Sequence, residues 1–135
     1  MKRIMKLSSF LVLVALIMTG CPAPIYNVEK SKITKSTESM DSIYKSIETA
    51  AESLTWQIKR TGKNEAIAIL YIRVHEAKVK ITFNEKEYSI TYIGGQNLSY
   101  KPSEGTIHEN YNKWVQKLES SIDEHLKKDS EIMSK

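Results

Sequence analysis

Residues 65–93 read EAIAILYIRVHEAKVKITFNEKEYSITYI, and this stretch decides the fold. Apolar residues alternate with other residues through three segments of it, which is the period of a half-buried β-strand. The alternating residues are Ala66, Ala68, Leu70, Ile72, Ala77, Val79, Ile81, Phe83, Tyr88, Ile90 and Tyr92. The stretch therefore predicts an antiparallel sheet of three segments.

The connections between these segments differ in how clearly the sequence marks them. The positions expected to face inward change from even to odd residue numbers between Ile72 and Ala77. A tight turn or a β-bulge at residues 73–76 would produce that change in parity. Gly and Asn are absent there, so a single bent strand is an alternative to a hairpin. Residues 84–87 are polar and lie between two alternating segments, which predicts a turn.

Two stretches on either side have the period of an amphipathic helix. The first, residues 38–60 with Gly62 as a stop signal, has the apolar positions Met40, Ile43, Tyr44, Ile47, Ala50, Ala51, Leu54 and Ile58. The second follows a turn-rich loop at residues 94–105 and begins at Thr106 and Glu109, which match a capping box. Its apolar positions are Ile107, Tyr111, Trp114, Leu118, Ile122 and Leu126.

Neither helix can bury its apolar stripe alone, and a three-stranded sheet with one apolar face needs a cover. The sequence therefore predicts a single α+β domain over residues 38–128. In it, two helices pack on one face of a three-stranded antiparallel sheet, in the chain order α-β-β-β-α. Residues 129–135 are predicted to form a polar tail.

The N-terminal residues are predicted to lie outside this domain. Residues 1–20 combine a basic start, an apolar run at residues 7–18 and the small residues Thr19 and Gly20, which is the layout of a secretory signal. The apolar run is too short for a transmembrane helix. Residues 21–37 are predicted to form a tether, although Val28 and its apolar neighbours Tyr26 and Ile33 could dock on the domain as an extended edge segment.

The tetrapeptide Met18-Thr19-Gly20-Cys21 resembles the lipobox of bacterial lipoprotein precursors. This resemblance implies cleavage between Gly20 and Cys21, a diacylglycerol on the thiol of Cys21, and a further acyl chain such as palmitate on the new amino terminus. Two or three acyl chains hold a protein on a membrane essentially permanently. Residue 22 is Pro rather than Asp, and by the same resemblance this favours the outer membrane, with the domain facing the periplasm.

The charge balance gives no electrostatic case for binding nucleic acid. The whole chain has 20 basic and 16 acidic residues, but three of the basic residues lie within residues 1–20, which have no acidic residue. Residues 21–135 therefore carry 17 basic and 16 acidic side chains, a net charge of +1. The expected partners are the membrane, through the lipid on Cys21, and another envelope protein.

No motif for catalysis, metal binding or cofactor binding stands out. The three histidines, His75, His108 and His125, have no metal-ligand spacing, so we expect neither a metal site nor a cofactor. No serine lies in a nucleophile motif with its partner residues. Ser42 and Lys45 have the spacing of one such motif, but they fit the solvated face of a helix. The sequence therefore predicts a protein that is not an enzyme and has no catalytic residues.

The mature chain is similar to a family of small uncharacterised lipoproteins from Gram-negative bacteria. The resemblance covers roughly residues 40–120 and implies a shared fold and an envelope location, but it brings no reaction. It rests on the following motifs: Arg73-x-His75-x-Ala77-x-Val79-x-Ile81, Tyr88-Ser89-Ile90-x-Tyr92, Asn97-Leu98-x-Tyr100 and Ile107-His108-x-x-Tyr111-Asn112-x-Trp114-Val115.

Aromatic and amide residues gather in and around the predicted loop, and together with Arg73 and His75 at the switch between two strands they are the candidate binding surface. They are Arg73, His75, Asn97, Tyr100, His108, Tyr111 and Asn112. Tyrosines combine an apolar body with a polar tip, which suits interfaces, although the same residues could serve the core and the loop backbone. The sequence favours a lipid-anchored interaction module that binds through residues 94–105 and the start of the second helix. The alternatives are a small-ligand-binding or hydrolytic protein using His75, His108 and Tyr100, and a purely structural lipoprotein.

Overall fold

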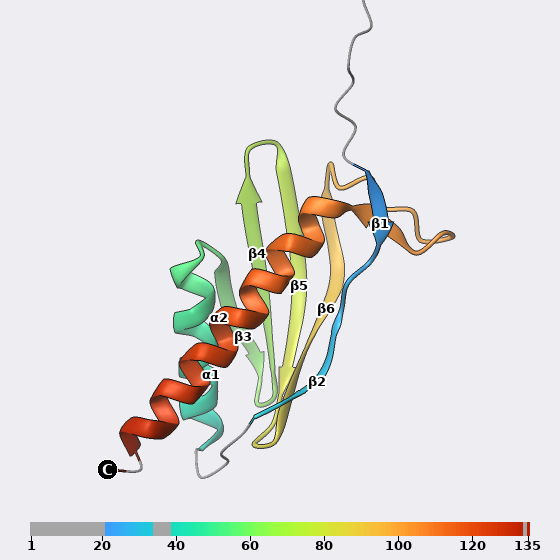
Figure 1. Cartoon of the computed structure of the whole chain (residues 1–135). Coiled ribbons are helices and arrows are strands. Elements are labelled where there is room, and N and C mark those ends of the chain that lie inside the picture. Colours follow the sequence, from blue (N-terminus) through green and yellow to red (C-terminus); the bar gives the residue numbers. More distant parts are fainter. Residues whose placement is uncertain (1–20, 34–38, 134) are drawn as a thin grey trace, which may run out of the picture.

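The computed structural model describes residues 21–33, 39–133 and 135 of the chain. Within those residues it forms strands and helices that build one layer of sheet and one layer of helix (Figure 1). They are, in chain order, β1 (Pro22–Pro24), β2 (Val28–Lys32), α1 (Met40–Ser53), β3 (Gln57–Gly62), β4 (Glu65–Ile72), β5 (His75–Phe83), β6 (Glu87–Gln96), β7 (Thr106–His108) and α2 (Glu109–Met133). Residues 1–20, predicted as a secretory signal, lie outside the described part of the chain.

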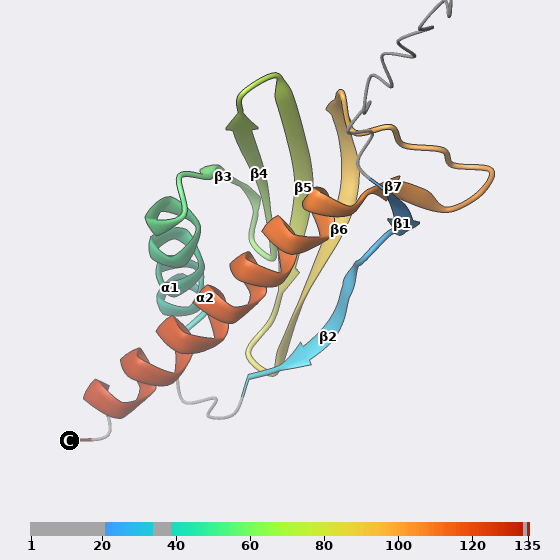
Figure 2. The ribbon, with the colours of Figure 1, turned by 45° about the horizontal axis from the view of Figure 1, so that its top comes forward.

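The main sheet has five antiparallel strands in the order β2-β6-β5-β4-β3. Strands β3 to β6 pair with their neighbours in sequence, and β2 adds to the remaining edge of β6. Strands β1 and β7 form a separate two-stranded ribbon beside the sheet (Figures 1 and 2). The N-terminal segment therefore covers one edge of the meander.

Both helices cover the same face of the sheet, and α2 crosses it diagonally from the ribbon toward α1 (Figures 1 and 2). The inner positions of β4 and β5 include Ala66, Ala68 and Ala77, whose small side chains let the helices approach the sheet closely. The two helices also bond to each other, because the buried Ser46 hydroxyl of α1 donates to the Asp129 carboxylate of α2. A single core lies between the two layers.

The predicted three-stranded sheet is wrong, since the sheet has five strands and a two-stranded ribbon stands beside it. One cause is the end of the first helix, which was expected at residue 60. α1 ends at Ser53, and the chain turns through Thr55, with φ at 68°, into β3. Leu54 and Ile58 keep helical spacing, but Ile58 is an inward position of a strand. Trp56, which lies off the helical stripe, is buried where the chain turns.

The second cause is the segment at residues 21–37, which the sequence predicts as a tether. Its described part carries β1 and β2 instead, over 22–24 and 28–32. Val28 is buried at the sheet edge and pairs with Ile90. The alternative noted for this segment, an extended edge segment docked on the domain, is the arrangement that β2 adopts.

The second helix starts later than the sequence predicts, because Thr106 belongs to β7 and α2 begins at Glu109. The capping box does not form, and Thr106 Oγ1 is buried without a hydrogen-bond partner among the described residues. Instead, Nδ1 of His108 accepts a 3.1 Å hydrogen bond from the backbone N of Asn110, so this histidine caps the helix. α2 continues to Met133, past residue 128, where the polar tail was predicted to begin.

The parity change in the deciding stretch comes from a hairpin rather than a bent strand. β4 and β5 pair without interruption up to Ile72 and His75, which leaves Arg73 and Val74 as a two-residue turn. Arg73 has φ at 55°, a conformation that hairpin turns of this length require of one or both turn residues. A bulge does occur in β6, where Ile93 is the extra residue between two pairs of the ladder with β5.

Candidate functional site

The seven residues predicted as a binding surface come together at one end of the domain, but they do not share one surface. Arg73 and His75 belong to the β4–β5 turn and the first position of β5. Asn97 and Tyr100 lie in the loop after β6, and the remaining three lie at the junction of β7 and α2. The structure divides them into a supporting group, a buried residue and two residues that line a groove.

Asn97 locks the hairpin turn to the loop after β6. Its Nδ2 donates a 2.6 Å hydrogen bond to the carbonyl oxygen of Val74. Its own carbonyl oxygen lies 2.7 Å from Nδ1 of His75, and because a carbonyl can only accept, this Nδ1 carries the proton. Asn97 tolerates φ at 56°, as asparagine commonly does. Its role is to position His75.

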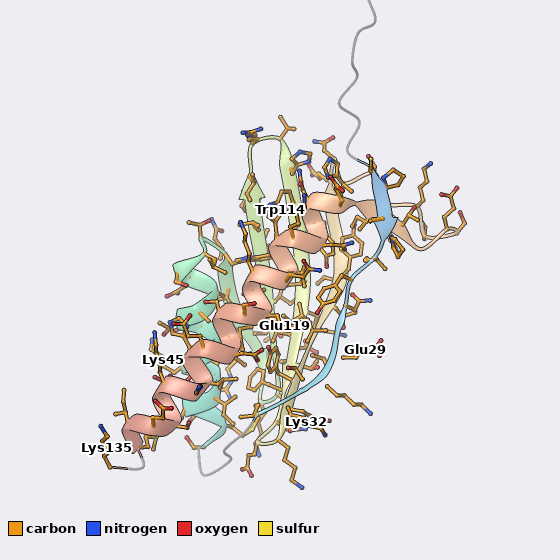
Figure 3. All side chains as sticks on the ribbon, in the orientation of Figure 1. Glu29, Lys32, Lys45, Trp114, Glu119 and Lys135 are labelled. Atoms are coloured by element: carbon orange, nitrogen blue, oxygen red, sulfur yellow. The ribbon has the colours of Figure 1, made fainter. Side chains whose placement is uncertain are left out.

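The ring of His75 lies close to two other rings. Its centroid is 5.5 Å from that of His108 and 5.8 Å from that of Trp114, both tilted by 53°. His108 uses Nδ1 as an acceptor for the helix cap, so the two histidines hold opposite hydrogen-bonding roles at Nδ1. The packed rings fix the half-buried Trp114 at the start of α2, where Figure 3 labels it.

The tyrosines predicted for the surface are divided between surface and core. Tyr100 is 42% exposed, and its ring contacts that of Tyr92 in a tilted arrangement with centroids 4.6 Å apart. Tyr111 is fully buried, and its ring meets the edge of Tyr92 at 5.2 Å. Burial raises the pKa of the Tyr111 hydroxyl well above its ordinary value. Tyr111 is therefore a core residue.

Asn112 holds the N-terminal segment and does not face a ligand site. Its Oδ1 accepts a 2.9 Å hydrogen bond from the backbone N of Tyr26, and its Nδ2 donates a 2.8 Å bond to the carbonyl oxygen of Pro24. The hydroxyl of Tyr26 in turn donates to Glu119 on the same helix at 2.7 Å. This hydrogen bond and partial burial raise the pKa of Tyr26.

A groove with a volume of about 900 Å³ runs along α2 beside the end of α1 and the β4–β5 turn. Its lining on α2 extends from Asn110 to His125, which corresponds to roughly 22 Å of helix. Arg73 and His75 line it from the hairpin, and Trp114 is its largest aromatic residue. Of the predicted surface, then, two residues line this groove directly.

The groove carries an excess of positive charge. Arg73, Lys113 and Lys117 line it, and Glu124 is its acidic residue. Glu124 is bonded at 2.7 Å to Lys128, whose ammonium lowers the pKa of that carboxyl. Nζ of Lys113 lies 3.8 Å from Oε1 of Glu109. Among the described residues, neither Arg73 nor Lys117 lies within 4.0 Å of a carboxylate oxygen.

The groove residues on α2 were missed as a site by the sequence analysis. Lys113 and Lys117 are four residues apart, so they lie on one helix face, and Ser120, Ser121 and Glu124 continue that polar face. A polar face of this kind is typical of an ordinary solvated helix surface. What distinguishes it is Trp114 next to the lysines, together with the hairpin turn opposite, and only the tertiary structure brings that turn to the helix.

The histidines and Tyr100 do not form an acid–base constellation. His75 and His108 are in ring contact, but Nδ1 of each is occupied by a backbone group. The ring of Tyr100 contacts that of Tyr92, and Tyr100 does not line the groove. Within the described residues, no three His, Cys, Asp or Glu side chains are grouped as metal ligands would be.

Cys21, the predicted lipidation residue, is the first residue that the structure describes, and it is exposed. Its carbonyl oxygen accepts a 3.3 Å hydrogen bond from the backbone N of Glu109, at the start of α2. Gly20, the other residue of the predicted cleavage site, lies outside the described residues.

Comparisons of this chain with protein-family models, with curated proteins and with solved structures find no match. No helix in the described part of the chain is both long enough and apolar enough to cross a membrane.

Proposed function

We propose that this chain is a lipid-anchored, non-enzymatic binding module of the bacterial cell envelope. The lipobox around Cys21 supports the anchor, and the exposure of Cys21 at the domain surface leaves its thiol accessible to a modifying enzyme. The module faces the periplasm from the outer membrane, because Pro22 follows the cysteine. It needs no metal or cofactor.

The ligand that fits the groove is an acidic, extended segment of another envelope protein. The observation that carries this proposal is a pair of cations, Arg73 and Lys117. Both line the groove together with Trp114, and neither has a carboxylate partner among the described residues. A carboxylate-bearing ligand would supply the missing partners through charge-assisted hydrogen bonds. The tryptophan would contribute apolar contact and supports affinity at protein interfaces.

The shape of the groove favours a peptide over a compact small molecule. Its lining follows α2 for about four turns, from Asn110 to His125, and it is open along one side. Small-molecule sites are usually enclosed and bury most of the ligand. An extended chain instead lies along such a surface and places successive side chains on it.

Binding of a labelled glutamate-rich peptide tests this ligand class. The protein is the mature chain carrying Cys21→Ser, and the measurement is fluorescence anisotropy together with amide chemical-shift mapping. Replacing both cations, Arg73→Ala/Lys117→Ala, is expected to weaken binding at least about tenfold, because two charged hydrogen bonds are lost. Shifts are expected at the groove residues of α2 and at the β4–β5 turn.

A matched variant separates specific binding from general attraction. Lys63→Ala/Lys86→Ala removes the same charge from two exposed positions that do not line the groove. It is expected to leave the affinity nearly unchanged. If both double variants weaken binding equally, or if the shifts lie outside the groove, the proposed ligand site is wrong.

The anchor is tested separately by mass spectrometry of the protein from bacterial membranes. We expect a mature chain that begins at Cys21 with a diacylglycerol on its sulfur and an acylated amino terminus. Cys21→Ser is expected to leave the protein unprocessed or to release it from the membrane fraction. A mature chain that begins elsewhere with a free thiol would contradict the lipid anchor.

A further inference from the structure

The chain enters the folded domain immediately after Cys21. Pro22 already pairs with His108 in the β1–β7 ribbon. The backbone N of Ile25 then donates a 2.9 Å hydrogen bond to the carbonyl oxygen of Gly105. With the bond from Glu109 to the Cys21 carbonyl, these contacts leave no free residues between the cysteine and the domain. A tether of sixteen residues would have allowed about 50 Å of movement.

The attachment is reinforced from the helix. The side chain of Asn112 bonds to the backbone of both Pro24 and Tyr26, and Tyr26 bonds to Glu119. Releasing Cys21 from the surface would therefore break strand pairing and several side-chain hydrogen bonds together. The position of Cys21 relative to the domain is as fixed as the strand that follows it.

The end of the domain that carries β1 also carries the β4–β5 turn and the loop after β6 (Figures 1 and 2). The exposed apolar and aromatic residues there include Val74 at 70%, Tyr71 at 56% and Tyr100 at 42% exposure. Arg73 and Lys101 add exposed positive charge, and Glu104 is the exposed acidic residue of the loop. We call this surface the anchor end. Its tyrosines and long basic side chains suit the boundary between lipid and water.

We infer that the lipid on Cys21 holds the anchor end directly on the bilayer surface, so that Val74 and Tyr100 rest in the lipid headgroup layer. This inference rests on the proposed function, because it assumes that Cys21 is lipidated. The partner of this surface is the bilayer itself. The groove then starts beside the membrane at Asn110 and leads away from it along α2 toward His125.

The predicted lipidation makes this orientation straightforward to test. Cys21 is the single cysteine, so in the lipidated mature protein an introduced cysteine is the one free thiol. Val74→Cys at the anchor end and Glu85→Cys in the turn at the opposite end of the sheet are both exposed and are each labelled with an environment-sensitive fluorophore. The protein is purified from bacterial membranes and reconstituted into vesicles of phosphatidylethanolamine and phosphatidylglycerol containing brominated lipid as a quencher.

We expect several-fold stronger quenching of the label at residue 74 than of the label at residue 85, with a blue-shifted emission only at 74. A flexible Gly/Ser insertion between Cys21 and Pro22 provides the control for attraction of the dye to lipid. The insertion keeps the lipid anchor but lets the domain move away from the bilayer. Quenching of the label at residue 74 is therefore expected to fall toward that of the label at residue 85.

The outcomes separate the inference from the function on which it rests. Equal quenching at both positions of the membrane-bound protein, or quenching at residue 74 that survives the insertion, would overturn the inferred orientation and leave the anchor intact. Protein that carries no lipid and does not bind the vesicles would overturn the proposed function, and the orientation would fall with it.

Discussion

Asn112 and Tyr26 are 86 residues apart in the chain and are joined by a 2.9 Å hydrogen bond from the backbone N of Tyr26 to Oδ1 of Asn112. The same amide group donates to the carbonyl of Pro24 at 2.8 Å. One side chain on α2 thus bonds to the backbone on both sides of Ile25, where the chain passes from β1 to β2.

Replacing this side chain is expected to loosen the N-terminal segment. Asn112→Ala leaves two backbone groups without their partner and should lower the free energy of unfolding by about 1–3 kcal/mol. Hydrogen exchange at the amide of Tyr26 should accelerate more than exchange in β4 and β5. Asn112→Asp retains the acceptor for Tyr26 but loses the donor to Pro24, so an intermediate effect is expected. Unchanged exchange at Tyr26 in the alanine variant would show that the clamp is not needed.

Two neighbouring glycines in β6 are expected to differ in how much their replacement by alanine destabilises the domain. A Cβ on Gly95 would lie 2.2 Å from the carbonyl oxygen of Glu76 and 2.7 Å from a methyl carbon of Leu98, whereas a Cβ on Gly94 meets nothing within 4 Å. Gly95→Ala should therefore force the β5–β6 ladder apart and cost about 1–3 kcal/mol. Gly94→Ala should change stability by less than about 1 kcal/mol.

Urea unfolding of the two glycine variants measures this difference, and amide chemical shifts show where it acts. Because Gly95 is two residues before Asn97, the shifts in Gly95→Ala are expected to reach His75, whose Nδ1 bonds to the Asn97 carbonyl. Equal stability of the two variants would mean that the backbone at Gly95 can move without cost.

The alternation in residues 65–93 was sufficient to place β4, β5 and β6, because a half-buried strand leaves a period of two in its sequence. Such a period could not reveal β3, where Ile58 continues the helical spacing of α1 and only the turn at Thr55 separates helix from strand. It could not reveal β1 either, because two of the three residues of β1 are prolines. Those strands are stabilised by pairing that a local pattern does not show: β1 pairs with the distant β7 and is held by Asn112, and β3 pairs with the next strand, β4.

The candidate site was predictable only in part for a similar reason. Arg73 and His75 stood out because they lie at the switch between two strands, where an inward-facing arginine needs a partner. Lys117 looked like any solvated helix residue, and nothing local indicated that α2 would bring it to the same groove as Arg73. Tyr111 was wrongly grouped with the surface, since a tyrosine on an apolar stripe can equally be buried, as it is here.

Two buried tyrosines provide a matched test of hydrogen-bond satisfaction in the core. The hydroxyl of Tyr88 bonds to Asp123 at 2.6 Å and to the carbonyl of Glu119 at 3.2 Å. The hydroxyl of Tyr111 has no partner among the described residues. Tyr88→Phe should therefore destabilise the domain by about 1–3 kcal/mol, whereas Tyr111→Phe should be neutral or stabilising by up to about 1 kcal/mol. Chemical denaturation of both variants checks the signs, and a Tyr111→Phe variant that is the less stable of the two would contradict them.

Alkaline solution is expected to destabilise the domain through its buried tyrosines. Burial, followed by the hydrogen bond to Asp123, raises the pKa of Tyr88 above its ordinary value of 10.0. Burial, followed by the hydrogen bond to Glu48, raises the pKa of Tyr44 to about 12. In the unfolded chain these phenols ionise near pH 10, while in the folded domain they stay protonated. Their contribution to stability is therefore complete below about pH 10 and is lost as the pH rises from there toward the folded pKa.

Urea unfolding between about pH 8 and pH 11 measures this loss, which should approach about 1.4 kcal/mol per pH unit for each tyrosine that stays protonated. Tyr88→Phe should reduce the slope of the free energy of unfolding against pH by the contribution of one tyrosine. Ile90→Val, which removes a buried methyl group beside it in β6 but no ionisable group, should displace the curve downward without changing its slope. If Tyr88→Phe keeps the full alkaline slope, the Tyr88 hydroxyl ionises as readily in the folded domain as in the unfolded chain.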